Sequence, residues 1–182
     1  MHTTKAATRY ATALLGVANE RNELEEILED IRFIHNTLND SSELVTFLKS
    51  PVIKFDDKTA VLDKLFFDEI REATKLFLKL LSRKDRINLL DQITTAFIAQ
   101  YKKQVGIITV NVYVAEELAD EQRELLHQKL EEKTQKKVEM DISLDKSLKG
   151  GMAIRIDDTV IDGTVKHQLE QLEESLLSST VE

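Results

Sequence analysis

The sequence predicts a mainly helical chain with a C-terminal α/β part, and three observations support this fold class. Residues 1–105 carry apolar residues at helical spacing, whereas parts of residues 106–182 alternate apolar and polar residues. Only 5 glycines and 1 proline occur in 182 residues, which favours long helices. Hydrophobic residues make up 42% of the chain, enough to fill a core. We therefore expect an N-terminal six-helix bundle in residues 1–105 and a small α/β domain in residues 106–182.

The N-terminal part contains six segments with helical periodicity. In the second segment, apolar residues recur at steps of three and four from Leu24 to Leu38, opposite an acidic face. Ser50-Pro51 ends the third segment, because the residue before a proline disfavours the helical conformation. The remaining expected helices have their apolar residues within 3–19, 44–48, 61–66, 73–81 and 87–101.

Polar residues mark where several helices are expected to start. Asp40 and Glu43 have the spacing of a capping box at the third helix. Asp56 is expected to cap the fourth helix and Asp162 the last one. Side chains of this type accept a hydrogen bond from a free backbone amide of the first turn.

After Gly106 the apolar period changes from 3.6 to 2, which predicts β-strands. Three alternating segments and a short apolar piece at Val160-Ile161 give three to four short strands, with a turn at Asp157-Asp158. Two helices are expected in addition, one between the first two strands and one at the end. The alternating segments are 108–114, 138–144 and 152–156, and the helices are 118–130 and 165–176.

The composition argues against several classes of partner. The net charge of −8 disfavours nucleic acid and anionic lipid surfaces. No apolar run approaches the length of a membrane span, about 18–20 residues, so we expect no direct membrane insertion. The first residues lack the apolar stretch of a signal peptide and the composition of a transit peptide.

No pattern typical of an active site is present in the sequence. Cysteine is absent, and the four histidines are scattered along the chain. The segment from Lys146 to Gly151 lacks the spacing of a phosphate-binding loop, and its paired glycines instead predict a turn before a strand. The aspartates near residue 160 lack the calcium-loop spacing. We therefore expect no catalytic residues, no metal, no cofactor and no small-molecule substrate.

Three ordered motifs resemble one family over about residues 6–177. Arg9-Tyr10-Ala11-Thr12-Ala13-Leu14 is similar to its opening motif, and Phe77-Leu78-Lys79-Leu80-Leu81 to a central one. The third motif runs from Asp145 to Val165 and includes Lys149-Gly150-Gly151-Met152 and Ile161-Asp162-Gly163-Thr164. The chain thereby resembles the δ-subunit family of bacterial F-type ATP synthases, equivalent to the mitochondrial oligomycin-sensitivity-conferring protein. It departs from the family mildly, with Thr164 in place of the usual serine and aspartates at a turn that often holds glycine.

The resemblance implies a non-catalytic stator subunit that resists rotor torque. In this family, the N-terminal bundle binds the N-terminal segment of an α subunit of the F1 head. The C-terminal part binds the C-terminal region of the b-subunit stalk of the Fo proton channel. The resemblance also implies a peripheral location on the cytoplasmic side of a bacterial inner membrane.

The resemblance further implies where the two partners bind. A groove between the first and fifth helices would hold the α-subunit segment, and we nominate Tyr10, Ala13, Leu14, Val17, Phe77 and Leu80. For the stalk we nominate Met152, Ile154, Val160, Val165 and Leu169. Each of these residues could instead fill the core of its own domain.

From the residues alone, two other classes of function stay open. The first is a stand-alone helical adaptor or regulatory scaffold that binds other partner helices. The second is a small enzyme whose site has no recognisable pattern.

Overall fold

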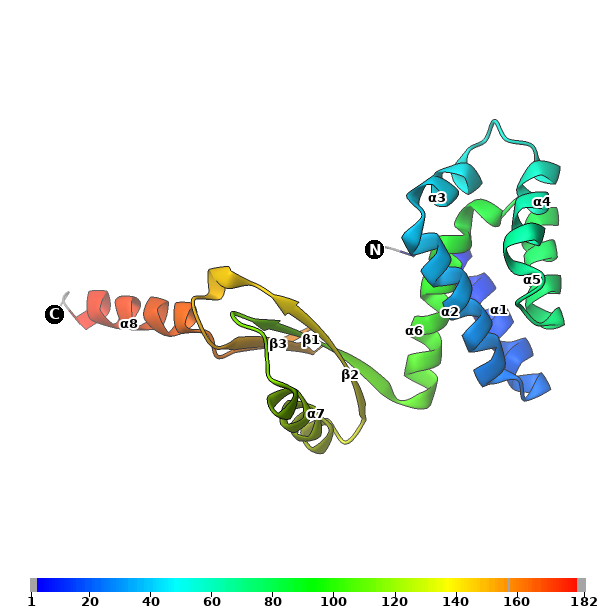
Figure 1. Ribbon diagram of the computed structural model, residues 1–182. Helices are drawn as coiled ribbons and strands as arrows, with labels where there is room; N and C mark the ends of the chain where they lie inside the picture. Colours follow the sequence, from blue (N-terminus) through cyan, green and yellow to red (C-terminus); the bar gives the residue numbers. More distant parts are fainter. Residues whose placement is uncertain (1–2, 157, 180–182) are drawn as a thin grey trace. The chain divides into compact units, whose positions relative to one another are not determined.

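The structure, a computed structural model, describes residues 3–156 and 158–179. The chain divides into two compact units, and the division falls between Gln104 and Val105. The described part of the first unit is helical, and that of the second contains a mixed four-stranded sheet (Figure 1). The helices of the first unit are α1 (Lys5–Arg21), α2 (Leu24–Asp40), α3 (Ser42–Lys49), α4 (Phe55–Phe66), α5 (Glu72–Arg83), the short 3-10 helix η1 (Ile87–Leu89) and α6 (Leu90–Val105).

Large apolar side chains fill the core of the helical unit. Ile27, Ile31 and Ile34 of α2 are fully buried, as their spacing along the helix predicts. Phe66 of α4 is also fully buried and packs edge-to-face against Phe33, with ring centroids 5.7 Å apart. Burial of each such side chain contributes roughly 1.5–3 kcal/mol, so this core holds the helices in fixed positions.

Two of the predicted helix caps in this unit are wrong. The cap of α3 is Ser41, whose Oγ accepts a hydrogen bond from the Leu44 amide at 3.2 Å. Asp40 instead belongs to the last turn of α2, because its backbone stays helical while that of Ser41 is extended. Helix α4 begins at Phe55, so Asp56 lies inside its first turn. A carboxylate at this position still interacts favourably with the helix dipole.

The second unit is built on a sheet with the strand order β2-β1-β3-β4. β1 and β2 run parallel, and α7 (Asp120–Thr134) forms the crossover between them. β3 is antiparallel to β1, and β4 is antiparallel to β3. The strands are β1 (Ile107–Val114), β2 (Lys137–Leu144), β3 (Met152–Ile156) and β4 (Thr159–Asp162).

Alternation along the strands gives the sheet one apolar face, and this face forms the core of the second unit. Val110 and Val112 of β1 are fully buried, and Leu130 of α7 packs in the same cluster. The register places Ile154 of β3 opposite Val112, so the apolar residues of neighbouring strands share one face. The predicted turn at Asp157-Asp158 includes Asp157, which lies outside the described residues.

The paired glycines before β3 make the turn that the sequence predicts. Gly151 has φ +76°, and a Cβ atom built on it would lie 2.4 Å from the carbonyl oxygen of Gly163. The Gly163 amide donates to the Met152 carbonyl at 3.0 Å, which fixes this close approach. The turn therefore holds the start of β3 beside the end of β4.

The last helix, α8 (Val165–Ser179), begins at the residue that the apolar spacing predicts, and it projects from the end of the sheet (Figure 1). Its predicted cap is wrong. Its capping side chain is Thr164, whose Oγ1 accepts from the His167 amide at 3.2 Å. Asp162, the predicted cap, instead accepts from the Thr164 amide at 2.9 Å. Within residues 3–156 and 158–179, no helix is both long and apolar enough to cross a membrane.

Candidate protein-binding groove

Helix α1 packs into the unit through small residues. Ala7, Ala11 and Ala18 lie on one face and are fully buried. Small side chains let neighbouring helices approach closely, so this strip of α1 belongs to the core. Leu14 lies at the edge of the same strip and is also buried.

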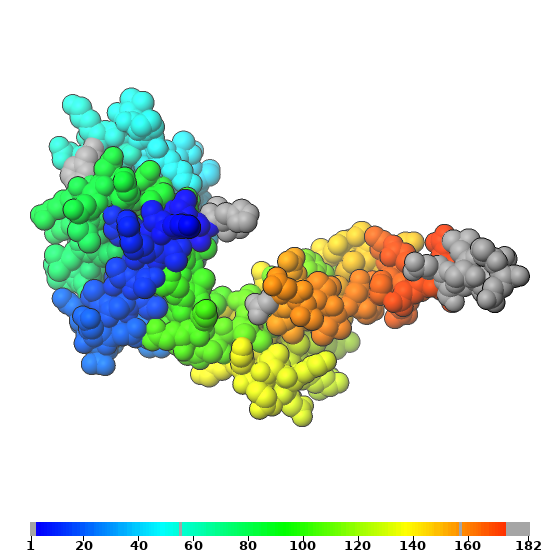
Figure 2. Space-filling view, turned by 180° about the vertical axis from the view of Figure 1, so that it is seen from behind, coloured from blue at the N-terminus to red at the C-terminus, as the bar shows by residue number. Residues whose placement is uncertain are grey.

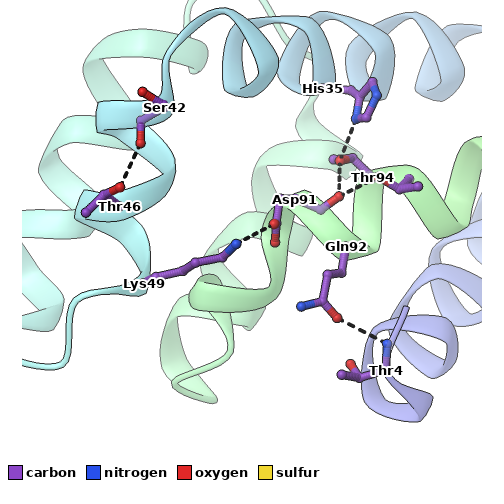
Figure 3. Close-up of polar contacts among 9 residues, drawn as sticks. Thr4, His35, Ser42, Thr46, Lys49, Asp91, Gln92 and Thr94 are labelled. Atoms are coloured by element: carbon purple, nitrogen blue, oxygen red, sulfur yellow. Dashed lines mark hydrogen bonds and ion pairs between the residues drawn. The ribbon is translucent and has the colours of Figure 1, made fainter. Parts of the chain in front are cut away.

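A second strip of α1 is joined to α6 by polar contacts. The Thr4 amide donates to Gln92 Oε1 at 3.1 Å (Figure 3). Near the other end of α1, Gln104 Nε2 donates to Asn19 Oδ1 at 2.8 Å. The start of α1 contacts the start of α6, and the end of α1 contacts the end of α6. The two helices therefore run parallel. The remaining side of α1 is free to form one wall of a groove.

A buried carboxylate on α2 fixes the start of α5, the other wall. Asp30 accepts from the Arg71 amide at 2.9 Å and from Thr74 Oγ1 at 2.7 Å. Arg71 Nη1 also donates to Asp30 at 2.8 Å, and Nη2 donates to Glu29. The hydrogen bond to Glu29 and the nearby Asp30 charge raise the pKa of Arg71. The network therefore sets the position of α5 relative to α2.

Polar contacts also anchor α6 at the end near α3 (Figure 3). Lys49 Nζ lies 2.7 Å from Asp91 Oδ2. His35 Nδ1 lies 3.2 Å from Thr94 Oγ1, which in turn donates to the Asp91 carbonyl. Burial lowers the pKa of His35, although the Asp91 charge opposes this shift. The His35 contact therefore links α2 to α6 within the helical unit.

Helices α1 and α5 border an apolar groove of about 440 Å³. Figure 2 shows the face of the helical unit that carries α1, in blue. On α5 the lining residues follow the steps of one helix face, i, i+3, i+4 and i+7. The lining consists of Arg9, Tyr10, Ala13, Leu14, Val17 and Arg21 from α1 and Ala73, Leu76, Phe77 and Leu80 from α5.

The structure brings all six residues nominated for the first partner into this groove. Leu14 and Phe77 form its floor, because they are 2% and 7% exposed and also pack in the core. Tyr10 is half-buried, and Ala13 is exposed. Val17 is also exposed, as is Leu80 of the opposite wall. The nominated set therefore contains both a floor and an accessible rim.

Four residues of the groove were missed in the sequence analysis. Ala73 and Leu76 share the α5 face with Phe77 and Leu80, so extending the helical spacing could have found them. Arg9 and Arg21 are not part of an apolar pattern; Arg9 lies one turn inside α1, and Arg21 is its last residue. Only the packing of α1 against α5 shows that these arginines line the groove.

The residues nominated for the second partner fall into two groups. Met152 and Ile154 are half-buried and pack against the core of the second unit. Val160, Val165 and Leu169 are exposed, with Val160 59% accessible at the edge strand β4. Among the side chains that the structure describes on β4 and α8, Ile161 and Leu172 are also apolar and exposed.

The groove itself is suited to binding and offers no convergent acid, base or nucleophile. Its interior is apolar, and its charged residues are the two arginines. Among the described residues, no group of three or more His, Asp or Glu side chains is placed to hold a metal ion.

Two units that each expose an apolar surface are typical of a connector, a protein that binds two partners and holds them together. A family model described as ATP synthase delta (OSCP) subunit matches residues 6–176. The chain belongs to this family. It is therefore a non-catalytic component of the peripheral stalk of ATP synthase, which decides against both the stand-alone adaptor and the small enzyme.

Individual relatives are similar to this chain over nearly its whole length. The chain is 42% identical to ATP synthase subunit delta of Chlorobaculum tepidum over 95% of its own length and 96% of the relative's. It is 38% identical to the protein of the same name from Pelodictyon phaeoclathratiforme, over 98% and 100% of the two chains. Its structure is similar to a chain in the cryo-EM structure of the Toxoplasma gondii mitochondrial ATP synthase hexamer, with a TM-score of 0.75 and 25% identity, covering 96% of this chain and 98% of that one.

Proposed function

We propose that the α1–α5 groove binds the N-terminal segment of an α subunit of the F1 head as an amphipathic helix. In this proposal α1 to α6 act together as a six-helix bundle. The observation that carries the proposal is the apolar groove with the exposed residues Ala13, Val17 and Leu80 along its rim. A helix that binds in such a groove inserts apolar side chains at i, i+3, i+4 and i+7.

The composition of the groove favours tight binding by a few residues. Tyr10 combines a large apolar ring with a polar tip, which is common among residues that dominate binding energy. Ala13 leaves room for a partner backbone to approach α1. Leu14 and Phe77 are held rigid by the core, so little conformational entropy is lost when a partner packs on them.

The same proposal assigns the second unit to the C-terminal region of the b-subunit stalk. Val165, Leu169 and Leu172 follow one another at steps of four and three on α8, the spacing of a two-helix seam. Val160 adds exposed apolar surface on β4, while Met152 and Ile154 support the sheet from within. The two units together would join the head to the stalk against rotor torque.

The location proposed for the protein follows from its partners. A chain bound to the F1 head and to the b subunits would lie on the cytoplasmic side of a bacterial inner membrane. Its attachment to the membrane would be peripheral and would depend on the assembled complex.

Calorimetric titration with a peptide of the α-subunit N-terminus tests the groove. We expect Tyr10→Ala and Ala13→Asp each to weaken binding at least tenfold, about 1.4 kcal/mol, because one removes an anchor and the other introduces a charge into an apolar contact. Tyr113→Ala and Ala60→Asp make the same changes at exposed positions outside the groove and should leave the affinity unchanged. Equal affinities for all four variants and the parent chain would reject the assignment.

A further inference from the structure

We propose that Arg9 and Arg21 make the groove selective for a helix that carries acidic residues at both ends of its apolar stripe. This inference rests on the proposed function of the groove and adds to it the charge pattern of the partner. It assigns a role to two residues that the apolar contacts leave unexplained.

The two arginines mark the opposite ends of the groove. They are twelve residues apart on α1, which corresponds to about 18 Å along a helix axis. Arg21 follows Val17 by one helical turn, so it lies on the groove face of α1. Arg9 stacks on Tyr10, with its guanidinium carbon 5.7 Å from the ring centroid, and this contact holds its charge at the rim.

The charge of the groove is opposite to that of the chain. The sequence holds 33 acidic residues against 25 basic ones, yet both charged residues of the lining are positive. Among the described residues, no salt bridge joins Arg9 or Arg21 to a carboxylate. Both are exposed cations that pair with no carboxylate of the described residues, and they lie beside a surface that is otherwise apolar.

This arrangement favours one kind of occupant. A helix with carboxylates about three turns apart would place one near each arginine while its apolar stripe covers the floor between them. A helix with lysine or arginine at its ends would bring like charges together and bind more weakly. Because the arginines are exposed, their main effect should be on the association rate and its dependence on salt.

The test uses the full-length chain and two designed helical peptides with the same apolar stripe. One peptide has glutamate at both ends of the stripe, twelve residues apart, and the other has lysine at these positions. The peptide of the α-subunit N-terminus is titrated in parallel. Arg9→Glu/Arg21→Glu is compared with Arg123→Glu/Lys129→Glu, which makes the same change in net charge at exposed positions on α7.

At low salt we expect the chain to bind the glutamate peptide about tenfold more tightly than the lysine peptide. The Arg9→Glu/Arg21→Glu variant should reverse this preference. Arg9→Lys/Arg21→Lys, which keeps both positive charges, should retain it. The α7 variant should also retain it. The differences should shrink at high salt, because exposed charges are screened. Equal binding of both peptides, or a preference that the groove variant leaves unchanged, would overturn the inference.

The α-subunit peptide separates this inference from the proposed function. If Tyr10→Ala weakens its binding while the designed peptides show no charge preference, the proposed function stands and the charge selectivity is wrong. If the designed peptides follow the arginine charges while the α-subunit peptide does not bind, the selectivity stands and the assigned partner is wrong.

Discussion

Asp30 is a buried side chain that positions α5, one wall of the groove, although it does not line the groove itself. Its side chain is 3% exposed and joins α2 to the first turn of α5 through the Arg71 and Thr74 contacts. A buried carboxylate is costly unless its oxygens accept hydrogen bonds, and here they accept from a backbone amide, a hydroxyl and a guanidinium. Removing the carboxylate leaves these donors without their acceptor.

We predict that Asp30→Ala lowers the free energy of unfolding of the helical unit by about 3 kcal/mol. Urea unfolding followed by far-ultraviolet circular dichroism measures this change. Glu26→Ala removes an exposed carboxylate from the same helix and should change the stability by less than about 0.5 kcal/mol. A loss for Asp30→Ala no larger than that of the control would show that the network does not hold α5.

At the residue scale, the positions of side chains that follow a periodic pattern were predicted better than the roles of side chains that compete to cap a helix. Tyr10, Ala13 and Val17 follow helical steps, so their common face could be predicted. The caps could not, because the run Asn39-Asp40-Ser41-Ser42 offers several acceptors and the backbone decides which residue leaves the helix. The two arginines could not be assigned to the groove because their role depends on which helices become neighbours.

Helix α1 shows how one element can serve the core and a partner at once. Its alanines bury one face, its polar residues contact α6, and its third face lines the groove. Apolar periodicity alone predicts that a helix has a buried face, but it does not say how far that face extends. The sequence therefore left open whether Leu14 and Phe77 fill the core or the groove, and the structure shows that they do both.

The strands were predicted more completely than the helix ends. Alternation in 108–114, 138–144 and 152–156 lies within β1, β2 and β3, because a period of two can be met only by a half-buried strand. The order β2-β1-β3-β4 could not be predicted from the alternation, since it depends on the α7 crossover and on the turn at Gly151.

The turn at Gly151 leaves no room for a side chain. Gly151→Ala should destabilise the second unit by about 2 kcal/mol or more, because a side chain at φ +76° is strained and its Cβ would collide with the Gly163 carbonyl. Hydrogen exchange of the β3 amides measures this loss of stability, and we expect it to be faster than in the parent chain. Gly16→Ala, on an α1 position with no atom within 4 Å of the added Cβ, should leave exchange in β3 unchanged and slightly stabilise the helical unit. Unchanged β3 exchange in Gly151→Ala would contradict the role of this turn.

At the scale of the whole molecule, the two exposed apolar surfaces belong to different units, which are divided after Gln104. The groove lies entirely in the helical unit, and Val165, Leu169 and Leu172 lie entirely in the second unit. A connector needs such a separation, because each partner must bind without displacing the other. It also needs slow dissociation under load, which well-packed apolar contacts provide better than exposed ion pairs.

We infer that both surfaces are needed to hold the catalytic sector on the membrane, and reconstitution is the experiment that tests this requirement. Membranes depleted of this chain are supplied with the parent protein, with Ala13→Asp, with Leu169→Asp or with Ala60→Asp, and ATP-driven proton pumping is measured. We expect the parent protein and Ala60→Asp to restore pumping, whereas Ala13→Asp and Leu169→Asp should each fail. Depleted membranes that keep their ATPase sector attached and proton-coupled would contradict this requirement.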